Sequence, residues 1–149
     1  MADITKDNAG KQAFLPLMRE LVRAYQAFSL YDAAGYQGTE LTPSQADVIF
    51  TLGNTAGMSC KEIGELTLIT KGTLTGIIDR LQAKSLVQRV SHETDRRSTV
   101  VKLTPAGEAV FAAQFPRQIS YHKQRFDKLS KKERKAAIEA LKRLREIFE

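Results

Sequence analysis

Residues 59–81 read SCKEIGELTLITKGTLTGIIDRL and contain two helix starts separated by a short turn. Ser59 and Glu62 form a capping box, which predicts that a short helix begins there. The connection 67–69 follows, and Thr70 is expected to cap a second, amphipathic helix. The apolar stripe of that second helix consists of Leu74, Ile77, Ile78 and Leu81. Two short helices joined by so tight a turn predict a helix-turn-helix unit.

The shorter helix and the segment before it complete this unit. We expect Ile63 and Leu66 to face inward from the shorter helix. Upstream, residues 42–45 read TPSQ, which combines a cap, a proline at the first helical position and a glutamine that completes a capping box. A further helix is therefore predicted over about 43–53.

Downstream of the helix-turn-helix the apolar period changes from helical to alternating. The segments 86–92 and 98–103 flank a polar turn at 93–97, and the second segment is rich in β-branched residues. This pattern predicts a β-hairpin. Another helix is expected to start at Pro105, and Pro116 should kink or end it.

The two ends of the chain are predicted to be amphipathic helices. The first begins near Phe14 and fades by Gly35, and the last begins at a capping box formed by Ser130 and Glu133. The apolar residues that recur at helical spacing, and that we expect to be buried, are Phe14, Met18, Leu21, Tyr25 and Phe28 in the first helix and Ile138, Leu141, Leu144 and Phe148 in the last.

These elements together predict a mainly α fold with a small β-hairpin wing. Residues 39–107 form the expected winged helix-turn-helix DNA-binding domain. The flanking helices, over 11–38 and 108–149, come from opposite ends of the chain and are predicted to form a dimerisation region. A chain of 149 residues fits one such compact domain with helical extensions.

Charge and composition bound the function. The chain has 23 basic and 17 acidic residues, a net charge of +6, and a basic second half. This excess indicates either a polyanionic partner or a solubilising surface, and the basic run 128–135 leaves the same choice open. A single cysteine excludes an internal disulfide. With neither a signal peptide nor an apolar membrane span, we expect a cytoplasmic protein without a membrane partner.

The segments LTPSQ (41–45), KGTLT (71–75), DRL (79–81) and DRRSTVVKLTPAG (95–107) are the most distinctive in the chain. Through them the chain resembles the MarR family of multiple antibiotic resistance regulators. The resemblance implies an obligate homodimer with interlocked terminal helices, bound to a pseudo-palindromic operator in double-stranded DNA. It also implies a repressor released by a small organic ligand, such as an aromatic or phenolic acid, or by oxidation.

The resemblance places the hairpin tip over a minor groove. A narrow minor groove concentrates negative potential, so Arg97 is expected to insert there. Asp95 would orient the Arg97 guanidinium through a charge-assisted hydrogen bond. Arg96 is expected to meet phosphate. The alternative interpretation of these three residues is a solvated turn whose charges bind nothing.

The second helix of the helix-turn-helix is the expected recognition helix. Lys71 and Arg80 are predicted to contact phosphates. Thr73 and Thr75 are predicted to make short contacts with bases or phosphates.

The centre of the recognition helix departs from the family. Gly72 and Gly76 lie opposite the buried stripe, and many family members carry Arg or Lys where Gly76 stands. Sequence preference is therefore expected to depend on groove shape. Asp79 would repel phosphate unless it is paired, so we assign it a structural role. Ser85 replaces the glycine that the family usually places at the left-handed end of this helix.

Two further groups of residues are candidates for regulation. A ligand site is predicted between the dimerisation helices and the DNA-binding domain, lined by Arg23, Tyr31, Tyr36 and Tyr121. The alternative for each of these residues is a place in the core or in the dimer interface. Cys60 is either a redox-sensitive thiol or a small buried residue, because a helix start favours a thiolate but relatives place sensing cysteines elsewhere.

Other functions find little support. Neither a catalytic constellation nor a cofactor motif is present, and His92 and His122 are poorly placed to share a metal with Cys60. A winged-helix protein interaction module that has lost DNA binding stays open because of the two central glycines. A small enzyme is the remaining alternative, and only the family's binding of small organic molecules favours it.

Overall fold

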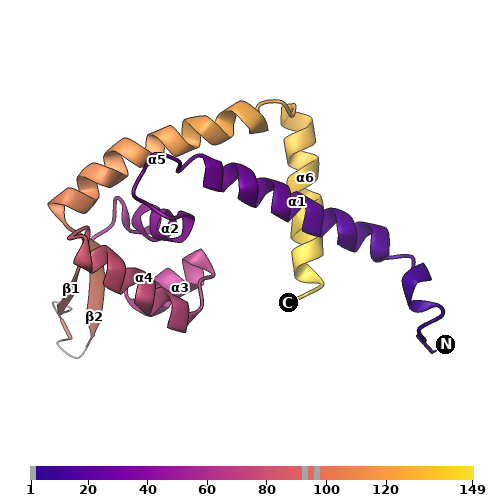
Figure 1. The fold of residues 1–149 in the computed structure, drawn as a ribbon, viewed down its shortest axis with the longest axis horizontal. Coiled ribbons are helices and arrows are strands. Elements are labelled where there is room, and N and C mark those ends of the chain that lie inside the picture. Colours follow the sequence, from indigo (N-terminus) through magenta and orange to yellow (C-terminus); the bar gives the residue numbers. More distant parts are fainter. Residues whose placement is uncertain (1–2, 92–93, 96–97) are drawn as a thin grey trace. The chain divides into compact units, whose positions relative to one another are not determined.

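The computed structural model describes residues 3–91, 94–95 and 98–149 (Figure 1). The chain divides into two compact units, an N-terminal unit, Met1–Thr39, and a C-terminal unit, Glu40–Glu149. The N-terminal unit contains the short helix η1 (Ala9–Lys11) and α1 (Leu15–Ala34). The C-terminal unit contains α2 (Pro43–Leu52), α3 (Cys60–Thr67), α4 (Lys71–Ala83), β1 (Val87–Ser91), β2 (Thr99–Leu103), α5 (Pro105–Phe126) and α6 (Lys131–Glu146).

The core of the C-terminal unit lies between α2, α3, α4 and the hairpin. Its largest fully buried side chains include Ile49, Leu52, Ile63, Ile78, Leu81, Val87 and Val101. The apolar stripe predicted for α4 is confirmed, because all four of its residues are at most 4% exposed. Burial of this stripe fixes which face of α4 remains available to solvent.

The prediction that Leu66 faces inward is wrong. Ile63 is fully buried, whereas Leu66 is 65% exposed. A helix turns about 100° per residue, so the buried face that contains Ile63 continues four residues later at Thr67, which is half-buried. Leu66 stands one position before that and points off the face. With eight residues, α3 is anchored by a single fully buried side chain.

Three capping boxes fix helix starts, as the sequence predicts. In each, the cap hydroxyl accepts from the third amide of the helix and the third side chain accepts from the cap amide; the pairs are Thr42–Gln45, Ser59–Glu62 and Ser130–Glu133. The amide and hydroxyl of Ser130 hold the pKa of Glu133 below its usual range. Thr70 occupies the cap position of α4, but its hydroxyl donates to the Thr73 hydroxyl at 3.1 Å and caps no amide.

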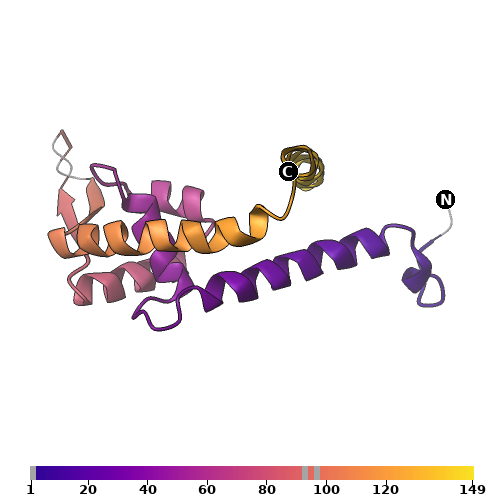
Figure 2. The ribbon, with the colours of Figure 1, turned by 90° about the horizontal axis from the view of Figure 1, so that it is seen from above.

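The predicted hairpin is confirmed. β1 and β2 pair antiparallel, with Val87 opposite Leu103 and Ser91 opposite Thr99. The segment before α3 joins the sheet edge, because Met58 and Val101 exchange backbone hydrogen bonds of 2.9 and 2.7 Å. Both views show the hairpin extending away from the helices at one end of the C-terminal unit (Figures 1 and 2). This projecting hairpin is the wing.

The wing leads directly into α5. The Thr104 hydroxyl accepts from the Gly107 amide at 3.0 Å and donates to the Ser85 carbonyl oxygen at 2.6 Å, so it joins the end of α4 to the start of α5. Ser85 has a φ of 61°, the left-handed conformation for which the family resemblance implied glycine. The alternative that Pro116 ends the helix is wrong, because α5 continues through it to Phe126. Figure 1 shows α5 as a gentle arc.

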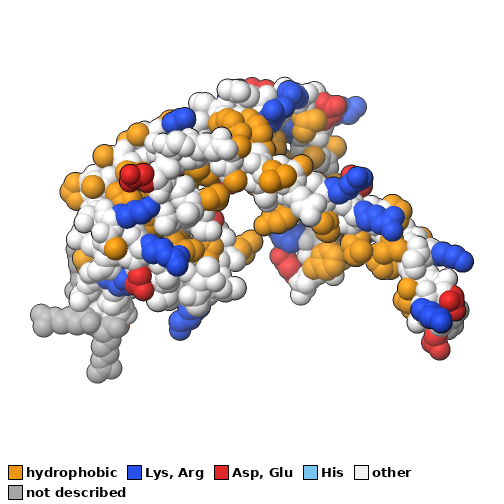
Figure 3. Space-filling model, viewed as in Figure 1, with side chains coloured by type: hydrophobic (Ala, Val, Ile, Leu, Met, Phe, Trp, Pro, Cys, Tyr) orange, Lys and Arg blue, Asp and Glu red, His pale blue; other side chains and the backbone are white. Residues whose placement is uncertain are grey.

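The apolar faces of the terminal helices remain exposed within one chain. Neither α1 nor α6 contributes a buried residue, so their predicted burial does not occur in the single chain. Figure 3 shows apolar patches along α1 beside basic side chains. The exposed large apolar residues on these helices are Leu17, Met18, Val22, Tyr25, Phe28 and Leu30 in α1 and Ile138 and Leu141 in α6. Each of these faces is an apolar surface that a further element can cover.

Candidate nucleic-acid interface

Helix α4 presents a polar face opposite its buried stripe. Lys71, Thr73, Thr75 and Arg80, the four residues predicted to contact DNA, are all exposed. At about 100° per residue, Lys71 and Thr75 lie along one edge of this face, and Thr73 and Arg80 lie along the other. Lys71 is also the first residue of α4, where the helix dipole adds positive potential. The structure therefore brings the four residues onto one surface that favours an anion.

The centre line of the same face carries few side chains because two of its residues are glycines. A Cβ atom built on Gly72 or Gly76 meets nothing within 4 Å. Neither glycine is therefore required by packing, and both leave open space in front of the helix backbone. Long side chains that could read bases are absent from this line, which limits direct readout to the residues along the two edges.

The two threonines differ in what their hydroxyls can offer. Thr75 donates to the Lys71 carbonyl oxygen at 3.1 Å, so its oxygen remains as an acceptor. Thr73 accepts from Thr70 at 3.1 Å, so its own hydrogen remains available to donate. Phosphate oxygens only accept hydrogen bonds. Thr73 is therefore suited to a phosphate or base acceptor, and Thr75 to an amino group on a base edge.

Asp79 is paired, as its predicted structural role requires. Its carboxylate lies 2.7 Å from a guanidinium nitrogen of Arg89 on β1. The other terminal nitrogen of Arg89 donates to the side chain of Gln82, also on α4. Sequence reasoning missed Arg89. The unpaired charge of Asp79 was a signal that a partner was needed, but the partner depends on how β1 crosses α4.

Of the three wing residues in the predicted site, Asp95 is the one that the structure describes. Asp95 accepts from the Ser98 hydroxyl at 3.1 Å, and its carbonyl oxygen accepts from the Ser98 amide at 3.0 Å. The predictions for Arg96 and Arg97, and for the orientation of Arg97 by Asp95, lie outside the described residues. Ser98 is a further partner of Asp95 that the sequence did not predict.

The predicted ligand residues are distributed over both units. Arg23 is exposed and lies 3.7 Å from Glu20 within α1, and Tyr31 is half-buried on the same helix. Tyr36 follows α1 and is 8% exposed. Tyr121 is on α5 in the other unit, where its ring meets His122 edge-on with centroids 5.8 Å apart. The shared site remains a prediction.

The structure bears on the burial of Cys60 and on the possibility of a metal site. Cys60 is half-buried at the first position of α3, so the expectation of a buried small residue does not hold. Among the residues that the structure describes, His, Cys, Asp and Glu form no group of three that could hold a metal ion. His92 lies outside that part. In the same part of the chain, no helix is long and apolar enough to cross a membrane.

Comparison with known proteins gives consistent matches. The model of the MarR family matches residues 39–98. The transcriptional regulator MhqR of Bacillus subtilis is 28% identical over 130 residues, which span 87% of this chain and 90% of that protein. A probable transcriptional regulator from Pseudomonas aeruginosa is 31% identical, with a TM-score of 0.66 and coverage of 81% of this chain and 92% of that one. Bordetella bronchiseptica BpsR, whose DNA binding is regulated by 6-hydroxynicotinic acid, is 27% identical, with a TM-score of 0.77 and coverage of 89% and 95%.

A helix-turn-helix followed by an antiparallel hairpin, with an exposed polar face on the second helix, defines the winged helix-turn-helix class of transcriptional regulators. Within that class, the chain belongs to the MarR family. The family and fold class predicted from the sequence are confirmed.

Proposed function

We propose that this protein is a homodimeric repressor of transcription that binds a pseudo-palindromic site in double-stranded DNA and is released by a small organic ligand. The observation that carries this proposal is the exposed polar face of α4 beside a projecting wing. The major groove, about 12 Å wide, admits a helix of this kind. Two copies related by a two-fold axis would place their α4 helices in successive major grooves.

The α4 residues receive distinct roles in this complex. Lys71 and Arg80 contact phosphates from opposite edges of the helix and set its register in the groove. Thr73 donates to a phosphate or base acceptor, and Thr75 accepts from a base amino group. Because Gly72 and Gly76 leave the centre line bare, discrimination between sites depends on groove shape and deformability as well as on these contacts.

The wing is assigned to the flanking minor groove. Arg97 inserts into the groove, Arg96 contacts phosphate, and Asp95 orients the Arg97 guanidinium. Asp95 already has Ser98 as a local partner, which supports a fixed position for its carboxylate. Arg89 supports the same arrangement from the base of the wing, because it joins β1 to α4.

Dimerisation is assigned to 11–38 and 108–149, and DNA binding to 39–107. The support for this division is the exposed apolar face on α1 and on α6. Contiguous exposed apolar surface is uncommon on monomeric proteins and marks interaction sites. Basic and acidic side chains cover the rest of α6, which fits an amphipathic helix with one buried face and one solvent-exposed face.

Ligand control is assigned by likeness to BpsR and by the candidate residues Arg23, Tyr31, Tyr36 and Tyr121. Tyrosine rings and a guanidinium suit an aromatic acid, because they offer stacking and a charge-assisted pair. A repressor of this kind works in the bacterial cytoplasm, where its DNA lies. No catalytic role is assigned to any residue.

The test is a titration of the protein against the DNA that flanks its own gene, followed by fluorescence anisotropy, with an unrelated duplex as control. Specific binding should weaken roughly 10³- to 10⁵-fold between 50 and 200 mM salt if 6–10 phosphates are contacted. Lys71→Gln and Arg80→Gln should each reduce the salt slope by about 0.9. Equal binding of the wild type and both variants would refute the roles assigned to these side chains.

One observation favours a second function, a winged-helix module that binds proteins. The bare line at Gly72 and Gly76 leaves α4 with few long side chains for reading bases. If this alternative holds, selection from a pool of random duplexes should recover no preferred sequence. Recovery of a palindromic sequence would refute it.

A further inference from the structure

Helix α2 is held at both ends by other helices of the C-terminal unit. At its start, the side chain of Gln45 accepts a hydrogen bond from Lys84, which stands at the end of α4. At its end, Gly53 lies against the ring of Phe111 on α5. Helix α2 therefore joins the helix that we propose to bind DNA to the region that we propose to dimerise.

Lys84 makes the contact at the start of α2. It occupies the C-terminal cap of α4, and its ammonium donates to the Glu40 carbonyl oxygen at 2.7 Å and to the Gln45 side-chain oxygen at 3.2 Å. Both acceptors are distant from Lys84 in the sequence, so the contact depends on the tertiary structure. Hydrogen bonds from a charged donor are stronger than those between neutral groups. The end of α4 is therefore tied to the start of α2 and to the chain just before it.

The Gln45 side chain is a buried acceptor with two donors. It is 5% exposed, and its oxygen also accepts from the Thr42 amide at 3.3 Å within the capping box. An amide oxygen has two lone pairs, so the Thr42 amide and the Lys84 ammonium together satisfy it. Removal of the ammonium would leave a buried lone pair without its donor, which is unfavourable. Lys84 therefore completes a buried polar cluster, although its own side chain is exposed.

The other end of α2 packs closely on aromatic rings of α5. Phe111 is 8% exposed, and a Cβ atom built on Gly53 would come within 2.2 Å of its ring. The ring centroid of Phe50, on α2, lies 6.5 Å from that of Phe111 and 5.1 Å from that of Phe115. Interiors packed this closely are barely compressible and transmit displacements. A displacement of α5 at these rings is therefore passed to α2.

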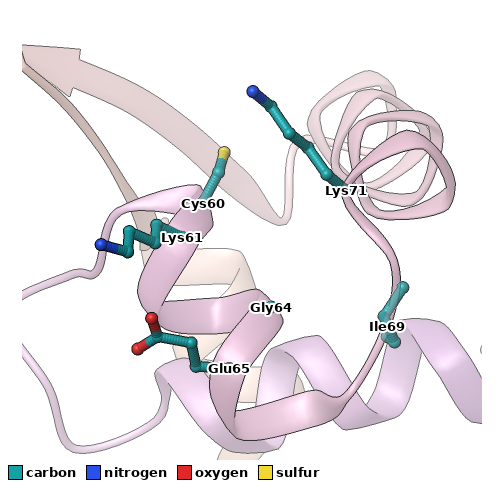
Figure 4. A pocket seen from close by; sticks show the side chains of 6 residues that line it. All are labelled: Cys60, Lys61, Gly64, Glu65, Ile69 and Lys71. Carbon is teal, nitrogen blue, oxygen red and sulfur yellow. The ribbon is translucent and has the colours of Figure 1, made fainter.

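The start of α4 has more room around it than its end. A cavity of about 510 Å³ lies beside it, and its lining includes Cys60, Ile69 and Lys71 (Figure 4). Figure 4 shows the side chains of Cys60 and Lys71 projecting from the starts of α3 and α4 toward this space. Thr70, at the cap position, makes no side-chain hydrogen bond to the first-turn amides. The polar attachment of α4 to α2 is thus at the opposite end, at Lys84.

We propose that Lys84 is a positioning residue for DNA binding, which passes the position of α5, through α2, to the recognition helix. The inference rests on the proposed function, because it takes α4 as the helix that enters the major groove. Lys84 contacts no phosphate in this arrangement. It fixes the direction of α4, and with it the positions from which Lys71 and Arg80 meet the duplex.

The first test is Lys84→Met, which keeps an unbranched side chain and removes its donors. Binding to the DNA that flanks the gene, or to a duplex selected from random DNA, should weaken about 10-fold through loss of a charge-assisted hydrogen bond. The salt slope should stay that of the wild type, whereas loss of a phosphate contact would reduce it by about 0.9. Lys84→Arg keeps charged donors and should recover most of the affinity. Lys6→Met removes the same charge ahead of η1 and should bind as the wild type does.

Hydrogen exchange in the free, full-length protein tests the contact itself. Lys84→Met should speed exchange of the amides of Ala46, in the first turn of α2, and of residue 84, at the end of α4. The amide of Ile63 on α3 serves as the internal reference and should exchange as in the wild type. Lys84→Arg should restore the slow exchange. This measurement requires neither DNA nor a dimer, so its failure is distinct from failure of the proposed function.

A double-variant cycle tests the path through α2. Gly53→Ala forces the Phe111 ring to move and should weaken DNA binding when Lys84 is present. In the Lys84→Met background the same change should have a smaller effect, because the link from α2 to α4 is already cut. Circular dichroism checks that each variant is folded. Additive effects of the two changes would show that α2 does not connect the two ends, and would overturn this part of the proposal.

Three results would overturn the role of Lys84 itself. They are wild-type affinity in Lys84→Met, a salt slope reduced by about 0.9 as for a direct phosphate contact, and unchanged hydrogen exchange at both helix ends. If the wild-type protein binds no DNA, the proposed function and the positioning role fail together. Hydrogen exchange then still decides whether Lys84 ties α4 to α2.

Discussion

The guanidinium of Arg89 lies 2.7 Å from the carboxylate of Asp79 and ties the first strand of the wing to the recognition helix. The same guanidinium also donates to Gln82, one turn further along α4. Asp79 stands on the face of α4 that we assign to DNA, where an unpaired carboxylate would repel phosphate. Arg89 therefore neutralises the one acidic residue of that face and fixes the wing against the helix.

Replacing Arg89 by methionine should affect DNA binding more than stability. The pair is partly exposed, so its loss should cost less than about 1 kcal/mol of unfolding free energy, measured by urea denaturation. The released Asp79 carboxylate should lower DNA affinity on the order of tenfold, measured by anisotropy at low salt. The double variant Arg89→Met with Asp79→Asn should recover most of that affinity. A double variant as weak as the single one would show that repulsion by Asp79 is not the cause.

Gly76 offers a test of both helix stability and DNA contact. Gly76→Ala places a methyl in open space, so it should raise the unfolding free energy by about 1 kcal/mol through helix propensity alone. Gly76→Lys should also strengthen DNA binding and steepen the salt dependence by about 0.9 in slope. The alanine variant is the control, since it should leave the salt slope unchanged. A lysine variant with the slope of the alanine variant would place this face away from DNA.

The local signals in the sequence predicted most of the fold. Capping boxes such as Ser59–Glu62 depend on residues three apart, and the apolar stripe of α4 depends on helical spacing, so neither requires knowledge of the tertiary structure. The hairpin followed for the same reason, from alternation and β-branched residues. Thr73 and the other three α4 residues of the candidate site were found because they flank the side opposite that stripe.

What the sequence could not give depends on contacts between elements. The Arg89–Asp79 pair is set by how β1 crosses α4, and no local pattern encodes that crossing. Leu66 was misassigned because one buried position in so short a helix leaves the edge of its inner face undefined. The end of α5 was uncertain at Pro116, where the helix continues despite the missing amide. The pocket lined by Cys60, Gly64 and Lys71 lies where α3 packs on α4, and no local sequence pattern predicts it.

The glycine at position 107, in the family-like segment 95–107, is required by packing. A Cβ atom at this position, in the first turn of α5, would collide with the Leu86 carbonyl oxygen. Gly107→Ala should therefore destabilise the protein by about 1–3 kcal/mol, because backbone must shift to admit the methyl. Thermal and urea unfolding measure the loss. Gly10→Ala is the matched control, since its Cβ meets nothing within 4 Å and should change stability little. Equal stability of the two variants would contradict the packing described at this junction.

The exposed face of α6 provides the test of dimerisation. Ile138 and Leu141 are 53% and 58% exposed in the single chain, on a helix that contributes no buried residue. If this face is buried against a second copy, Leu141→Glu should place a charge in an apolar interface and shift the protein to monomers at micromolar concentration. Sedimentation equilibrium measures the change. Lys142→Glu alters the adjacent residue of α6 by a larger change in charge and should leave the dimer intact, since Lys142 is charged and does not belong to the apolar face. A Leu141→Glu variant that stays dimeric would remove α6 from the interface and leave α1 and α5 as the remaining candidates.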